Sequence, residues 1–203
     1  MNNNMLNKIK YPLMKNNIIK KDIQKIINFL KKNNVLTQKK EVLKFEKKWS
    51  KWLGVKYSTF VNSGASANLI TLKILKELKK NKTEVIVPAF TWNSDIVSVV
   101  NSGFKPIFVD INLKNLALDE KKVIKKISKR TAAIFLTHAM GFVGISKNFL
   151  NYLKKKNIFL IEDACESHGS NLNGKKSGAL GEVSNFSFYY SHHMSTIEGG
   201  MIS

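Results

Sequence analysis

The sequence predicts an α/β fold in which helices cover both faces of a mostly parallel β-sheet. Two observations predict this fold. Short runs of apolar and β-branched residues alternate along most of the chain with longer segments whose apolar residues recur at helical spacing. These short runs are apolar at consecutive positions, as in strands that are covered on both faces. A sheet of this kind binds ligands beyond the carboxyl ends of its strands.

Two predicted helices open the chain. The first spans residues 21–33, where isoleucines and a leucine fall at helical spacing and lysines lie between them. The second spans residues 40–53, with Gly54 as its stop. The residues of the second helix that we expect to be buried are Val42, Phe45, Trp49 and Trp52.

A short strand over residues 57–61 then enters a turn of small residues. This turn begins at residue 62 and opens a third helix that continues through Leu78. A helix start leaves backbone N–H groups free, so the turn is a candidate anion cradle. Ser and Gly are also ordinary helix-start residues, and capping alone is the simpler explanation of the turn.

The remaining elements follow in alternation. Strands are predicted over residues 84–88, 105–109, 132–136, 158–162 and 184–189, and helices over residues 92–101, 120–128 and 147–156. Residues 171–178 predict a hairpin turn before the last of these strands.

Polar residues stand where the predicted strands end. Ser63 to Ser66 follow the first strand, and the later ends carry Thr91, Trp92, Asp110, His138, Asp163 and Glu166. Asp163 and Glu166 directly follow an apolar strand, where a buried acid needs a partner such as a protonated ring nitrogen. N-capping of a short helix by Asp163 is an alternative that this segment alone leaves open.

Residues 187–200 concentrate reactive side chains. The segment holds Ser187, the adjacent His192 and His193, and a Glu-Gly-Gly turn at residues 198–200. Taken alone, it supports a catalytic role and a surface position about equally. The four histidines of the chain show no metal-ligand spacing, so no metal site is expected.

Composition argues against several classes of function. The net charge is +20, but of the 34 Lys and Arg residues only Arg130 is arginine, whereas nucleic-acid recognition favours the guanidinium group. We interpret the charge as a compositional bias and expect no nucleic-acid partner. No apolar run approaches the roughly 18 residues of a membrane span, and the single Cys165 cannot form an internal disulfide. We therefore expect a cytoplasmic protein without a membrane partner.

Taken in order, these segments resemble the DegT/DnrJ/StrS family of pyridoxal-phosphate-dependent sugar-nucleotide aminotransferases, which share the fold of the aspartate aminotransferases. The resemblance covers the chain from about Leu36 to its last residue. It is carried by LT (36–37), FE (45–46), VNSGASA (61–67), VIVPAFTW (85–92), FVD (108–110), IEDACESHG (161–169), FSFY (186–189) and EGG (198–200).

The resemblance implies an aspartate aminotransferase-like large domain that binds pyridoxal 5'-phosphate or pyridoxamine 5'-phosphate. It assigns Gly64, Ala65 and Ser66 to cofactor binding, with the amides of Ala65 and Ser66 on the phosphate. It also implies that Ser187 adds a hydroxyl to this phosphate site.

For the cofactor ring, the resemblance implies three further contacts. Trp92 would stack on the pyridine ring, and Asp163 would pair with the ring nitrogen and keep it protonated. Glu166 would lie near the ring face or on the substrate side of the cofactor.

One position departs from the family pattern. The family's lysine that holds the cofactor covalently stands six residues before the acid of the Glu-Gly-Gly turn, and here His192 occupies that place. An imidazole cannot form that link, so the cofactor would be held non-covalently as pyridoxamine phosphate, with His192 as a base. The same change from Lys to His is found in the family's sugar 3-dehydratases.

By this resemblance the protein is a 3-dehydratase that acts on a nucleotide-linked 4-keto-6-deoxyhexose, for deoxysugar and surface polysaccharide biosynthesis. Glutamate would be the amino donor that restores pyridoxamine phosphate. Two alternatives remain, an ordinary sugar-nucleotide aminotransferase of the same family and an inactive truncated remnant. The missing lysine argues against the first, and the intact Glu-Gly-Gly turn with His193 argues against the second.

The resemblance also implies a domain organisation. We expect an N-terminal helical segment over residues 1–35 and a partial large domain over residues 36–203, with the family's C-terminal small domain absent. Family members build their active site between two subunits, so we expect a homodimer in the full-length form.

Overall fold

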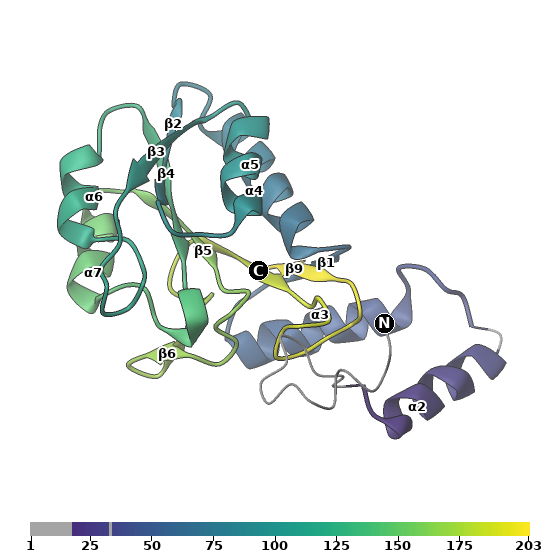
Figure 1. The fold of residues 1–203 in the computed structure, drawn as a ribbon. Helices are drawn as coiled ribbons and strands as arrows, with labels where there is room; N and C mark the ends of the chain where they lie inside the picture. Colours follow the sequence, from purple (N-terminus) through teal and green to yellow (C-terminus); the bar gives the residue numbers. More distant parts are fainter. Residues whose placement is uncertain (1–17, 33) are drawn as a thin grey trace, which may run out of the picture. The chain divides into compact units, whose positions relative to one another are not determined.

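The computed structural model describes residues 18–32 and 34–203, which form two separate units (Figure 1). The first unit, up to Lys39, contains helix α2 (Lys20–Lys31). Asp22 fastens the start of α2, because its carboxylate accepts the Ile19 amide at 3.2 Å. The predicted helix over residues 21–33 is confirmed as far as Lys31, whereas its last residue lies outside the described residues. No helix in the described part of the chain is both long and apolar enough to cross a bilayer.

The second unit, Lys40–Ser203, begins with helix α3 (Lys40–Leu53). Gly54 ends this helix as predicted: its φ is +86° and its amide donates to the Ser50 carbonyl at 2.9 Å. Trp49 is buried, but the prediction that Trp52 is buried was wrong, since its side chain is 40% exposed. Trp52 packs against Trp49, with ring centroids 4.7 Å apart, and the Lys176 ammonium group lies over the Trp52 ring at 5.3 Å from its centroid.

A seven-stranded sheet forms the centre of this unit, in the order β1-β9-β8-β5-β4-β2-β3. All strands run parallel except β9, which pairs antiparallel with both β8 and β1. Their bounds are β1 Thr59–Val61, β2 Glu84–Pro88, β3 Lys105–Val109, β4 Thr131–Thr137, β5 Phe159–Asp163, β8 Val183–Ser187 and β9 Gly200–Ile202. The predicted mostly parallel sheet is confirmed, with strand ends that shift by one or two residues.

Helices cover both faces of the sheet, as predicted. Helices α4 (Gly64–Leu78) and α5 (Asn93–Asn101) lie on one face, and α6 (Glu120–Lys126) and α7 (Lys147–Lys155) lie on the other (Figure 1). The apolar runs serve both layers because alternate strand residues point to opposite faces. In β2, for example, Val85 and Val87 pack in the core under α4 and α5, whereas Ile86 packs in the core under α6 and α7.

A third apolar cluster joins α3 to the antiparallel end of the sheet. It contains Trp49, Phe186, Phe188 and Met201, and Trp49 packs edge-on against both phenylalanine rings at 4.8 and 4.9 Å. The aromatic residues around the segment 187–200 therefore form core packing that holds β8 and β9 in place.

The predicted hairpin is also confirmed. Strands β6 (Asn171–Leu172) and β7 (Lys175–Lys176) pair antiparallel across Asn173 and Gly174. Both turn residues have positive φ, of 51° and 82°, as a two-residue hairpin turn requires.

Glu162 ties several loops to the centre of the sheet. This fully buried residue of β5 accepts hydrogen bonds from the amides of Gly178, Leu180 and Gly181 at 2.7 to 2.8 Å. It also contacts Nε2 of the buried His138 at 2.8 Å. Because the Gly144 amide donates to Nδ1 of His138 at 2.9 Å, the ring proton is on Nε2 and points at Glu162.

These donors make Glu162 a buried anion. Burial raises the pKa of a carboxyl group, but the hydrogen bond from His138 and those from the backbone amides outweigh it, and the pKa of Glu162 is lowered. The charge is thus satisfied within the fold, and it fixes the loops 138–144 and 178–181 around β5.

We predict that Glu162→Gln destabilises the protein strongly. The glutamine NH₂ group would face N–H donors that now have an acceptor, at a cost of roughly 3 kcal/mol in the free energy of unfolding. Denaturant unfolding of Glu162→Gln beside Glu77→Gln, an exposed glutamate on α4, measures the difference. A loss for Glu162→Gln no larger than that of the control would contradict this account.

Candidate active site

The structure brings most of the sequence-predicted site residues to one edge of the sheet, but not all of them. The carboxyl ends of β1, β2, β4, β5 and β8 meet beside the start of α4. Asp110 lies away from this place, after the edge strand β3, and its exposed carboxylate pairs with Lys122 at 2.5 Å. His138 is fully buried and bound to Glu162. These two strand-end residues therefore have structural contacts instead of a place in the site.

The start of α4 retains free amides for an anion. Ser63 caps the helix, since its hydroxyl oxygen accepts the Ser66 amide at 3.1 Å. Within the described residues, the amides of Gly64 and Ala65 have no hydrogen-bond acceptor. Capping and anion binding are therefore compatible here, because the cap uses one amide and leaves two others at the positive end of a 15-residue helix.

Glycines allow three segments to meet at this helix start. A Cβ atom on Gly64 would lie 2.7 Å from Cβ of Ser187, and a Cβ atom on Gly200 would lie 2.3 Å from the Ser63 carbonyl oxygen. Both distances are too short for any side chain. The end of β8 and the start of β9 are thus packed directly against the cradle, and Ser187 is placed beside it.

Asp163 lies across from the cradle at the end of β5. Its carboxylate is 5% exposed, with Oδ1 accepting the Cys165 amide at 2.9 Å and Oδ2 lying 3.4 Å from Nδ2 of Asn68. The chain after Asp163 forms turns, so the alternative of a short capped helix was wrong. Cys165 itself is a neutral thiol, because burial, followed by the charge of Asp163, raises its pKa well above the usual value.

Sequence reasoning missed a second buried acid beside Asp163. Asp95, in the first turn of α5, is 1% exposed and accepts Nδ2 of Asn68 at 2.8 Å. Its Oδ2 also contacts the hydroxyl groups of Thr137, at 3.0 Å, and of Thr91. Burial, followed by the charge of Asp163, raises the pKa of Asp95 well above its usual value. An acid in a first helical turn is normally a surface residue at the helix dipole, so the sequence offered no signal for this role.

His192 lies in a loop that closes on itself. The Phe188 amide donates to the Gly199 carbonyl at 2.9 Å, and the Thr196 amide donates to the Phe188 carbonyl at 3.0 Å. The half-buried His192 is held within this loop by its own amide, which donates to the Tyr189 carbonyl at 3.0 Å. Burial lowers the pKa of His192, and the negative charges of Asp163 and Glu166 act in the opposite direction. His192 is thus a neutral base on which the charges of both acids act.

A third histidine lies beneath this loop. The His168 ring centroid is 5.6 Å from that of His193 and 6.5 Å from that of His192, and it packs against Trp49. Burial, then the neighbouring His193 and His192, lowers the pKa of His168 to about 4, so its ring is neutral at pH 7. Within the described residues, no three His, Cys, Asp or Glu side chains are arranged to hold a metal ion.

Two predicted residues form the rim of the site. Trp92 directly precedes α5, and its side chain is 72% exposed. Glu166 lies in the turn after β5 and accepts the Met140 amide at 2.8 Å. Both side chains border the carboxyl edge, but the structure describes no contact between them.

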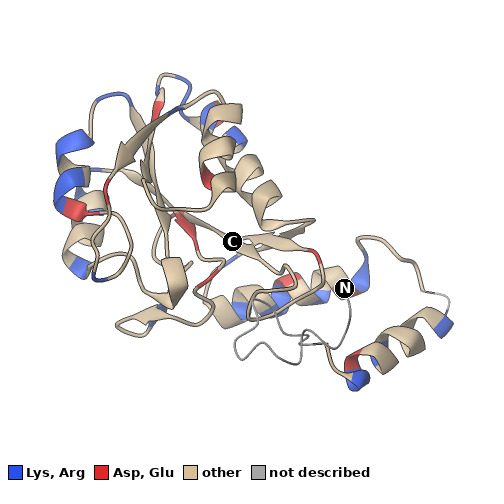
Figure 2. Ribbon diagram, in the orientation of Figure 1, with Lys and Arg blue, Asp and Glu red and all other residues tan. Residues whose placement is uncertain are grey.

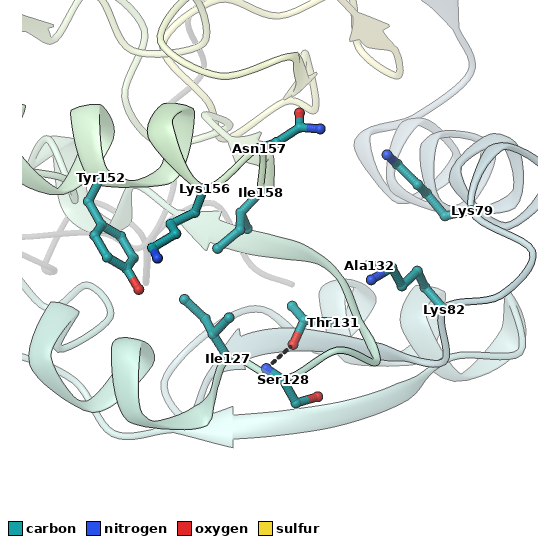
Figure 3. Close-up of a pocket in the computed structure, with 10 residues that line it drawn as sticks. All are labelled: Lys79, Lys82, Ile127, Ser128, Thr131, Ala132, Tyr152, Lys156, Asn157 and Ile158. Carbon is teal, nitrogen blue, oxygen red and sulfur yellow. Dashed lines mark hydrogen bonds between the residues drawn. The ribbon is translucent and has the colours of Figure 1, made fainter.

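Hollows in the surface do not mark a competing site. One of about 200 Å³ lies between α4 and α5 and borders Ala65 and Ser66. Another, of about 270 Å³, lies at the opposite ends of the strands, next to Thr131 of β4, and is lined by Lys79, Lys82 and Lys156 (Figure 3). Lysines occur over α3, α4, α6 and α7 alike (Figure 2), so their presence at this hollow reflects the general charge of the chain.

Known proteins share both sequence and fold with this chain. GDP-4-keto-6-deoxy-D-mannose 3-dehydratase of Yersinia pseudotuberculosis is 37% identical over 184 residues, which cover 89% of this chain and 46% of that protein. GDP-perosamine synthase of Vibrio cholerae is 32% identical over 168 residues, covering 83% and 45%. A structure of GDP-4-keto-6-deoxymannose-3-dehydratase with a trapped PLP-glutamate geminal diamine superimposes with a TM-score of 0.88 at 31% identity, covering 95% and 51%.

This chain therefore spans about half the length of the curated relatives it matches. Residues 16–203 match the sequence pattern of one family, and the parallel sheet agrees with that match. The chain belongs to the DegT/DnrJ/EryC1/StrS aminotransferase family.

Proposed function

We propose that this chain carries the cofactor-binding part of a 3-dehydratase that acts on a nucleotide-linked 4-keto-6-deoxyhexose, with GDP-4-keto-6-deoxymannose as the first candidate. The main support is the loop 188–199, which holds a neutral, half-buried His192 on which the charges of Asp163 and Glu166 act. Lysine is abundant elsewhere, but residues 177–203 contain none. The site therefore offers an imidazole base where an amine would be needed for a covalent link to the cofactor.

The residues present fit pyridoxal or pyridoxamine phosphate. The unpaired amides of Gly64 and Ala65 suit the phosphate, with Ser66 and Ser187 beside them. Asp163 is a buried acid without an ion-pair partner among the described residues. Its carboxylate is therefore available to pair with a protonated ring nitrogen. Further support comes from the trapped PLP-glutamate compound in the related 3-dehydratase.

The proposed roles follow from these contacts. When bound, the cofactor supplies an amine for the C4 ketone of the sugar and a ring that accepts electrons. Asp163 holds a proton at the ring nitrogen, and Trp92 covers the ring. His192 takes a proton through an imidazole nitrogen and brings no amine to the site, so loss of the C3 hydroxyl is favoured over simple amino transfer. Glu166 lies on the substrate side.

The rest of the proposal concerns the whole protein. Glutamate serves as the amino donor, the full-length form is a homodimer, and the reaction takes place in the cytoplasm to supply deoxysugars for surface polysaccharides. An ordinary aminotransferase is the second candidate, supported by the match to GDP-perosamine synthase. His192 favours the dehydratase, because aminotransferases of this family use a lysine at that position.

Product analysis distinguishes the two candidates. We expect the purified protein, given pyridoxamine phosphate, glutamate and GDP-4-keto-6-deoxymannose, to release ammonia and a 3-deoxy-4-keto sugar, detected by mass spectrometry. A 4-amino sugar as the product would contradict the dehydratase proposal.

His192→Asn should lower the rate roughly 10²- to 10⁴-fold, as expected for loss of a general base. His193→Asn, which changes an exposed neighbour of the same type, should stay within a few-fold of wild type.

The pH dependence tests the state of His192. Its folded-state pKa is lowered by burial, so the base is lost only when the pH falls below the ordinary histidine value of about 6.5. The acid limb of kcat/KM should therefore lie below that value. An acid limb above pH 6.5, or one that His192→Asn leaves in place, would show that another group acts as the base.

A further inference from the structure

Asp95 and Asp163 form a pair of buried acids that no positive side chain in the described part of the chain neutralises. Their side chains are 1% and 5% exposed, and among the described residues neither lies within ion-pair distance of Lys, Arg or His. One amide connects them, since Nδ2 of Asn68 lies 2.8 Å from Oδ1 of Asp95 and 3.4 Å from Oδ2 of Asp163. Two carboxylates this close and this buried cannot both remain ionised, so the pair keeps one proton.

Counting hydrogens places that proton on Asp95. Oδ2 of Asp95 contacts the hydroxyls of Thr91 and Thr137, and these hydroxyls lie 2.6 Å from each other. Three oxygens in mutual contact need three hydrogens, whereas the two threonines supply only two. A protonated Asp95 supplies the third.

The surroundings of Asp163 suit the ionised form. Its Oδ1 accepts the Cys165 amide at 2.9 Å, and Oδ2 faces the Asn68 amide. The raised pKa of Asp95 agrees with this division of charge. Asp95 also stands three residues after Trp92, so its contacts connect the segment that carries Trp92 to β4 and to Asp163.

We propose that Asp95 is a positioning residue for Asp163, held as a neutral carboxylic acid so that Asp163 carries the single negative charge of the pair and faces the ring nitrogen of the cofactor. The part of this proposal that concerns the ring nitrogen rests on the proposed function. The neutral state of Asp95 does not depend on it.

The first test needs no cofactor. Carbon-13 NMR of protein labelled at the aspartate carboxyl carbon should show one signal that stays protonated well above the ordinary aspartate pKa of about 3.9. Asp95→Asn should remove this signal, whereas Asp110→Asn, which changes an exposed acid after β3, should leave it. Ionisation of Asp95 at or below the ordinary value would overturn the proposal.

The second test uses pyridoxal phosphate as the probe. Asp95→Asn keeps a neutral group of the same shape. Its Kd for pyridoxal phosphate should therefore stay within about threefold of wild type, and the pH-dependent absorption of the bound cofactor should not change. Asp95→Ala removes the group that supports Asp163. It should weaken the binding of pyridoxal phosphate about tenfold or more and shift the absorption of the bound cofactor, and Asp163→Asn should have the same two effects. The positioning role would be contradicted if Asp95→Asn lost as much affinity for pyridoxal phosphate as Asp163→Asn does. It would also be contradicted if Asp95→Ala bound the cofactor like the wild type. If the wild type binds no pyridoxal phosphate, the proposed function fails, and the NMR titration still decides the state of Asp95.

Discussion

The arrangement of this domain depends on two adjacent acids at the end of β5. Neighbouring residues of a strand point to opposite faces of the sheet, so Glu162 and Asp163 serve different purposes although they follow one another. Glu162 is satisfied by three loop amides and His138, which fixes the loops 138–144 and 178–181 around the strand. With its neighbour anchored in this way, Asp163 is held at the opposite face, toward Asn68 and the start of α4.

Close backbone packing at the start of α4 explains the glycines of the site. The close approach of β8 to the start of α4 leaves no room for a Cβ atom at Gly64, and that of β9 leaves none at Gly200. These glycines bring Ser187 and the free amides of α4 to one place, while the aromatic cluster under α3 supports β8 and β9 from the other side. The segment 187–200 therefore combines core packing, backbone packing and a reactive loop, which explains why so many special residues occur together there.

Much of this could be predicted from the sequence. Hydrophobic periodicity located the parallel strands and the helices around them within one or two residues, because burial on both faces leaves a clear pattern. Strand ends located Asp163 and the cradle for the same reason. The short antiparallel strand β9 was not among the predicted strands. The direction of individual side chains could not be predicted: His138 follows β4 and Asp163 ends β5, yet His138 turns to Glu162 while Asp163 turns to Asn68. Asp95 escaped notice because only tertiary packing distinguishes it from an ordinary first-turn acid. The roles of the site residues toward a cofactor rest on the family resemblance and remain predictions.

The central claim is that His192 leaves the cofactor without a covalent link to the protein. The most direct measurement is the intact mass of the protein after saturation with pyridoxal phosphate and reduction with borohydride, which makes any link between a lysine amine and the cofactor permanent. We predict that the wild-type mass stays unchanged, whereas His192→Lys gains the mass of one reduced cofactor. Stoichiometric attachment of the cofactor to a lysine of the wild-type protein would contradict the account.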